Sequence, residues 1–548
     1  MKRNILLLTA LFIFGTLFAQ EDSQNAVVSV ENDYNPTIVT VNKKSFTPTV
    51  ESKSQAKPAE LIFSKQTTPY TGFVSEKNTK ELLPTQERPL PGYLRVGYGI
   101  RNDIDAKLAY NLNFGTKSHL RVLGAFDGFK SNINGYSGKW SSRMFNTAVV
   151  ADFVYKFKKL TFNIDADFNN RVFNYQRAIK MDASNNQHHM NYNVDINGVS
   201  QLSGPVAYTF NAGYTHSIIN YVNGVKNPMT EDHINAGGTI THEVYKDYLR
   251  LVGINVDFNG FIYNSTLHNA AHSYRNLFAM DFNPFANFNL KSWEIMFGAK
   301  LNIRTANGPI FAIAPNITVD KSLTKRISFY AGITGGREDN SFRTIEQFTP
   351  YWGYNSLTDK QIKPTYRIVD VVAGTRLTLE PLSFDIFAGY VLTKDDLMQA
   401  YLTPDATTGL VYSNLVQGLT NNAHAGCRIG YDCRGILNIE ADAKYDYWTC
   451  KERDYLVLKP EITANAKIEV LPVRNLKIKV GYNFTRYTKG ATERVTDKHD
   501  LHARVSYSIN KNFGAFIQGD NLLNDRYYEF AGYETKGIRG MLGATVNF

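Results

Sequence analysis

The feature that most constrains this chain is a strict alternation of apolar and polar residues. It is clearest over 437–447, where one set of alternate positions is apolar or aromatic: Leu437, Ile439, Ala441, Ala443, Tyr445 and Tyr447. The positions between them are polar: Asn438, Glu440, Asp442, Lys444 and Asp446. Successive side chains of a β-strand point to opposite faces. The segment therefore predicts a strand with one face in hydrocarbon and the other in water.

The same alternation recurs at 160–168, 295–303, 476–484 and 501–509. Each segment is close to the roughly 9–11 residues that a tilted strand needs to cross a bilayer. One or two such strands would fit a soluble β-sandwich, whereas many in succession indicate a transmembrane barrel. Composition agrees, because 33 Tyr and 34 Phe accompany a charged fraction of only 20%.

Turn residues divide the chain from Gly92 onward into strand pairs. Ten short turns are predicted near 115–117, 158–159, 203–204, 246–247, 291–292, 322–325, 380–381, 434–435, 472–475 and 510–512. With a short extracellular turn at 101–103 and a long extracellular excursion within 394–422, they predict about 22 strands. The expected fold class is all-β: an antiparallel, up-and-down transmembrane β-barrel over 92–548, with both chain ends in the periplasm.

The first 91 residues differ from the rest. Residues 1–19 combine a basic start with an apolar run from Ile5 to Phe18, which predicts a Sec signal peptide cleaved after Ala19. Residues 20–91 contain seven prolines and many Lys, Glu, Ser and Thr. They predict an extended periplasmic arm, which could be a reduced plug, a tether or a simple spacer.

The end of the chain carries a family motif. Asn521 and Leu522 begin an Asn-Leu-Leu-Asn stretch that runs to Tyr527, a Gly-Tyr pair follows at Gly532, and the last strand ends in Phe548. This stretch resembles the closing hairpin of TonB-dependent receptors. The resemblance is best over the last 150 to 170 residues and implies that family's 22-stranded outer-membrane barrel.

The resemblance also implies nutrient uptake across the outer membrane, with TonB or another periplasmic or outer-membrane protein as partner of residues 20–91 and membrane lipid around the barrel. However, the family's plug domain has well over a hundred residues, and only 72 lie between the signal peptide and Gly92. The alternative is therefore a plugless barrel that acts as a structural or assembly subunit of an outer-membrane complex.

No other pattern indicates chemistry. No catalytic set, cofactor site or metal site can be placed by spacing, so the chain is not expected to be an enzyme. The formal net charge of +10 is spread singly, which argues against nucleic acid. His188 and His189 are expected in a solvated extracellular loop, and Cys427, Cys433 and Cys450 are expected to be unpaired.

One polar segment, 336–364, is rich in aromatic residues. These candidate binding residues are Phe342, Phe348, Tyr351, Trp352 and Tyr354. Large rigid aromatic side chains can stack on sugars or contact a partner protein. The favoured alternative is that they pack against neighbouring loops or lie in the lipid headgroup belt.

Overall fold

The computed structural model describes residues 91–179, 186–200, 204–222, 225–244, 246, 248–265, 275–352, 362–404, 409–433, 435–490 and 495–548. All of them belong to one compact unit. The predicted signal peptide, and the predicted arm apart from Pro91, lie outside the described residues. Tyr354 lies outside them as well.

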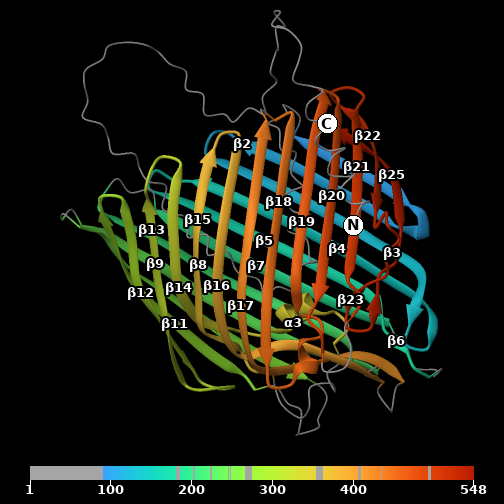
Figure 1. The fold of residues 1–548 in the computed structure, drawn as a ribbon, viewed down its shortest axis with the longest axis horizontal. Coiled ribbons are helices and arrows are strands. Elements are labelled where there is room, and N and C mark those ends of the chain that lie inside the picture. Colours follow the sequence, from blue (N-terminus) through green and yellow to red (C-terminus); the bar gives the residue numbers. More distant parts are fainter. Residues whose placement is uncertain are drawn as a thin grey trace, which may run out of the picture. The chain divides into compact units, whose positions relative to one another are not determined.

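Almost all of the described chain is β-structure (Figure 1). The strands that form the barrel wall are β1 (Gly92–Gly99), β2 (Ile104–Phe114), β3 (Ser118–Gly135), β4 (Gly138–Lys156), β5 (Leu160–Asn174), β7 (Asn186–Ser200), β8 (Val206–Val222), β9 (Val225–Glu243), β10 (Leu249–Ser265), β11 (Leu277–Leu290), β12 (Trp293–Arg304), β13 (Phe311–Ser322), β14 (Ile327–Glu338), β15 (Thr365–Leu379), β16 (Leu382–Pro404), β17 (Leu410–Cys433), β18 (Leu437–Cys450), β19 (Pro460–Val473), β20 (Leu476–Tyr487), β21 (Lys498–Ser508), β22 (Phe513–Asp520) and β25 (Arg539–Asn547).

The remaining elements are short. They are the 3₁₀ turns η1 (Ile100–Asn102) and η3 (Arg453–Leu456), the helix α3 (Phe342–Phe348), and the strands β6 (Gln176–Arg177), β23 (Tyr528–Phe530) and β24 (Tyr533–Glu534). No helix in the described part of the chain is long and apolar enough to cross a membrane.

Each wall strand pairs antiparallel with the next, and the sheet closes on itself. Closure occurs between β1 and β25, where Leu94 lies opposite Val546. The backbones of Gly92 and Phe548 exchange two hydrogen bonds, with N–O distances of 2.7 and 3.0 Å. The predicted closed barrel of 22 antiparallel strands is thereby confirmed.

Loop lengths divide the barrel into two ends. All ten predicted short turns lie at junctions between consecutive strands, although 322–325 and 472–475 overlap the last residues of the preceding strand. They therefore share one end, called the turn end. The connections at the opposite end, called the loop end, include every long one. Gly92 and Phe548 lie at the turn end, because η1 joins β1 to β2 at the loop end.

The predicted excursion within 394–422 is wrong in kind. Most of these residues continue β16 and β17 as a long two-stranded ribbon, which stays paired as far as Pro404 opposite Val411. The ribbon bends at Asp395, whose φ is +53°, and the register shifts between Thr393 and Asp396. Two paired strands can continue beyond the membrane. The requirement for apolar residues holds only at positions that face lipid, so it does not apply to this extension.

The two faces of the strands have opposite chemistry, as predicted. On β18 the Asp446 side chain is only 1% exposed, whereas its neighbour Tyr447 is 56% exposed on the outer face. Asp442 points inward and accepts a hydrogen bond from Asn465 of β19 at 2.9 Å. Polar residues therefore lie on the lumen side, and apolar ones are left for lipid. Among the described residues, Cys427, Cys433 and Cys450 are free thiols.

Candidate functional site: a loop across the barrel mouth

The longest connection at the loop end, residues 339–364 between β14 and β15, folds against the inside of the barrel. We call it the lid loop; the structure describes it at 339–352 and 362–364. Its two ends are held together, because the Asn340 side chain donates to the Lys363 carbonyl at 2.6 Å. At its start, Asp339 accepts from the buried Arg304 of β12 at 2.9 Å. The loop is therefore anchored at its neck.

The helix α3 forms the inner part of the lid loop. Ser341 caps its N-terminus by accepting from the Thr344 amide at 3.1 Å. Phe342, Ile345 and Phe348 follow at helical spacing, and all three are buried. In addition, the amide of Phe342 donates to the carboxylate of Glu231 on β9 at 2.8 Å. The start of the helix is thus tied to β9, five wall strands away from β14.

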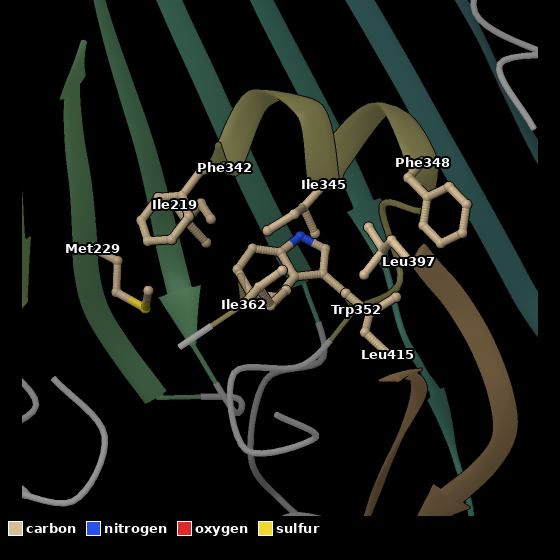
Figure 2. Close-up of a cluster of buried hydrophobic side chains, with 9 residues drawn as sticks. All are labelled: Ile219, Met229, Phe342, Ile345, Phe348, Trp352, Ile362, Leu397 and Leu415. Atoms are coloured by element: carbon tan, nitrogen blue, oxygen red, sulfur yellow. The ribbon is translucent and has the colours of Figure 1, made fainter. Parts of the chain in front are cut away.

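An apolar cluster surrounds α3 (Figure 2). Trp352 returns beneath the helix and is only 4% exposed. The cluster joins lid-loop residues with side chains of β8, β9, β16 and β17, namely Ile219, Met229, Phe342, Ile345, Phe348, Trp352, Ile362, Leu397 and Leu415. Since these strands come from different parts of the wall, the loop bridges the lumen at this end.

A second cluster, made mainly of aromatic residues, joins the lid loop to residues near the C-terminus of the sequence. Tyr351 stacks on Tyr533 with ring centroids 3.6 Å apart and meets Phe173 edge-on at 5.4 Å. Backbone contacts reinforce it, because the Tyr175 hydroxyl donates to the Trp352 carbonyl at 2.6 Å. Ser413 of β17 donates its amide to the Tyr351 carbonyl at 2.8 Å. Each aromatic pair adds about 0.5–1.5 kcal/mol beyond its buried area.

The aromatic residues predicted as candidate binders are thus packed in these clusters. Phe342, Phe348, Tyr351 and Trp352 are all buried, so they contact neighbouring loops and strands rather than solvent. Their role in binding stays a prediction.

One ionic contact pins the lid loop to the wall. The Glu346 carboxylate on α3 lies 3.5 Å from Arg171 of β5 and 3.5 Å from Nδ1 of His189 on β7. Asn191 donates to it at 3.2 Å. Burial alone would raise the pKa of Glu346, but the charge of Arg171 and the contacts with His189 and Asn191 lower the pKa to about 2. The carboxylate is therefore ionised at neutral pH.

Sequence reasoning misses this contact. The sequence places His189 in a solvated loop, but the residue lies on β7 and is only 2% exposed. The one local signal is that Glu346, four residues after Phe342, falls on the apolar face of the helix. Arg171 and Glu346 are 175 positions apart, so no spacing could have joined them.

The closing motif has a structural place. Asn521 adopts a positive φ of 47°, and its side chain donates to the Asp525 carbonyl at 2.7 Å and accepts from the Asp525 amide at 3.0 Å. Leu522 is partly exposed and Tyr527 is buried. Gly532, with φ of +69°, forms the β23–β24 turn, and its carbonyl accepts from Gln176 at 2.9 Å. The motif thus shapes the hairpin that carries Tyr533 into the aromatic cluster.

Within the described residues, no group of three or more His, Cys, Asp or Glu side chains could hold a metal ion.

No protein-family model and no curated protein matches the sequence. Solved structures do match the fold. The siderophore receptor PirA from Acinetobacter baumannii aligns with 83% of this chain and 80% of its own, at 12% identity and a TM-score of 0.63. The FrpB iron transporter from Neisseria meningitidis aligns with 86% and 83%, at 10% identity and 0.65. A point mutant of the ferric enterobactin receptor PfeA from Pseudomonas aeruginosa aligns with 83% and 80%, at 11% identity and 0.60.

The barrel therefore has the fold of the TonB-dependent receptors, as the closing motif predicted. The matched structures are named as siderophore receptors or as an iron transporter, and at these identities the likeness shows the fold alone.

Proposed function

We propose that the protein takes up a nutrient across the outer membrane, and that the lid loop is the gate at the extracellular mouth of its barrel. The observation that carries this proposal is the bridge that α3 makes from β14 and β15 to Glu231 and Arg171 on other parts of the wall. The fold shared with iron and siderophore receptors supports uptake as the function. In the orientation usual for outer-membrane barrels, the long loops face outward and the short turns face the periplasm.

The proposal includes export and energy supply. Residues 1–19 direct the chain to the Sec pathway and are removed, which leaves both mature ends in the periplasm. Residues 20–91 then contact TonB or another periplasmic or outer-membrane protein. The position of Gly92 at the turn end supports this arrangement, because the barrel begins at that end and its short turns face the periplasm.

Single-channel conductance in planar bilayers tests the gate. We would compare the mature chain with a variant in which a short Gly-Ser linker replaces residues 340–363, a variant lacking 20–91, and the double variant. The short distance between Asn340 and Lys363 makes the linker feasible. We expect the mature chain to be closed and the loop replacement to give large openings, alone or combined with the arm deletion.

The outcomes separate the competing interpretations. If only the double variant opens, loop and arm both close the lumen, and the arm is a reduced plug. If all four proteins stay closed under ligand-free and ligand-supplied conditions, transport through the lumen is refuted. The alternative, a structural subunit of an outer-membrane complex, would then stand in its place.

A further inference from the structure

The contact around Glu346 has the composition of a carboxylate-binding site. Arg171 and His189 lie directly opposite each other on β5 and β7, and Asn191 is the next inward-facing residue on β7. All three side chains converge on the two oxygens of one carboxylate, at 3.2 to 3.5 Å. A guanidinium with additional N–H donors is the usual way proteins recognise carboxylates and other oxyanions.

The donors and the carboxylate belong to different parts of the molecule. The donors lie on paired strands of the barrel wall, and Arg171 is held by its own hydrogen bond to Asn146 of β4 at 3.0 Å. The carboxylate lies on a loop whose inner part is joined to the wall through side chains. The wall site is therefore preorganised without the lid loop, which supplies only the anion.

A second observation shows that the wall offers more hydrogen bonds than Glu346 uses. Gln187, two residues before His189 on the same face of β7, is fully buried, and neither its amide nitrogen nor its oxygen has a partner among the described residues. Nε2 of His189 also has none in that part of the chain. Buried polar groups are normally paired, because leaving them unpaired costs stability. A ligand larger than one carboxylate could use these groups.

We propose that Arg171, Gln187, His189 and Asn191 form an anion cradle that binds a carboxylate or similar oxyanion of the transported solute, and that Glu346 occupies it in the closed state as an internal substitute. An incoming anion competes with Glu346 for the cradle, and release of Glu346 frees α3. The proposal rests on the proposed uptake function and names the chemical class of its ligand. It also gives a role to the charged residue that lies on the buried side of the helix.

A matched pair of lid-loop variants tests the cradle. Glu346→Gln empties it of its anion. Arg343→Gln instead breaks the other ion pair that joins α3 to the wall among the described residues, the 3.8 Å pair with Asp167. In that second pair the wall carries the negative charge, so its loss frees no anion site. Both variants would be made in the mature full-length chain, in lipid nanodiscs, and titrated calorimetrically with citrate as an anionic probe and glucose as a neutral one.

We expect Glu346→Gln to bind citrate at least about tenfold more tightly than the parent chain, because the competing form is lost. Arg343→Gln should bind citrate with the same affinity as the parent chain. Glucose should bind neither to the parent chain nor to the variants. Adding Arg171→Gln to Glu346→Gln should abolish the gain in citrate affinity. Heat-modifiable mobility on gels would show that each variant holds a folded barrel.

Two results would overturn the proposal. One is equal citrate affinity in the parent and Glu346→Gln, and the other is a gain that persists without Arg171. Either would leave Glu346 as a structural contact only. The conductance of the loop-replaced barrel is a separate measurement. A negative citrate titration would refute the anion cradle but leave the gate proposal intact. A failure of the gate proposal would appear in the conductance measurement alone.

Discussion

Replacing Glu346 by Gln should loosen the lid loop by a predictable amount. The pKa of Glu346 falls from a usual 4.5 to about 2 in the closed form. Since one pKa unit corresponds to about 1.4 kcal/mol, this shift implies that the ionised carboxylate stabilises closure by about 3 kcal/mol. An independent comparison gives a similar figure, because removing one partner of a buried ion pair costs about 3–5 kcal/mol.

Amide hydrogen exchange measures this loss directly. The Ile345 and Thr349 amides donate to Ser341 and Ile345 carbonyls at 2.9 and 2.8 Å, so their exchange reports the opening of α3. A loss of about 3 kcal/mol predicts exchange roughly a hundredfold faster in Glu346→Gln. Amides in the middle of the barrel strands should be unaffected.

Arg343→Gln is again the matched control. Its partner distance is 3.8 Å and its side chain is 36% exposed, so the pair should contribute less than about 1 kcal/mol. If α3 in Glu346→Gln exchanges within about threefold of the parent rate, or no faster than in Arg343→Gln, the reasoning from the buried carboxylate is refuted.

Three further predictions concern the lid loop and the wall. Trp352→Ala removes the buried ring beneath α3 and should destabilise closure by about 3–5 kcal/mol, seen as frequent openings in planar bilayers. Because the depressed pKa of Glu346 makes its contribution complete above pH 4.5 and lost toward pH 2, acidification through that window should increase the opening of the parent channel more than that of Glu346→Gln. On the outer face of β18, Ala441→Arg should cost about 2–4 kcal/mol in vesicle unfolding titrations. The inward-facing neighbour change Asp442→Asn should cost about 1 kcal/mol or less.

The barrel wall could be predicted because its determinants are local. In 437–447 each residue's face follows from its neighbours alone, and the structure places Asp446 inside and Tyr447 outside as the alternation requires. Turn residues such as Gly435, with φ of +71°, mark strand ends in the same local way. Strand number and closure then follow from counting.

The lid loop could not be predicted because its determinants are distant. Glu346 is meaningful only beside Arg171 and His189, and neither strand carries a signal for a loop far along the chain. The extension of β16 and β17 was missed for a related reason. Beyond the bilayer no lipid enforces alternation, so Lys394 to Asp396 read as a loop although the strands continue to pair.

Aromatic residues illustrate why composition alone misleads here. Tyr445 and Tyr447 face lipid, whereas Tyr351 and Trp352 form the inside of a closure, and both groups contribute to the same high count. The spacing of the apolar residues distinguishes the two groups, because the lid loop changes to helical spacing at Phe342, Ile345 and Phe348. A helical apolar face within a barrel loop has no lipid to face and must pack on the wall. In such a loop, the ionised Glu346 is the group through which a charged solute could act on the gate.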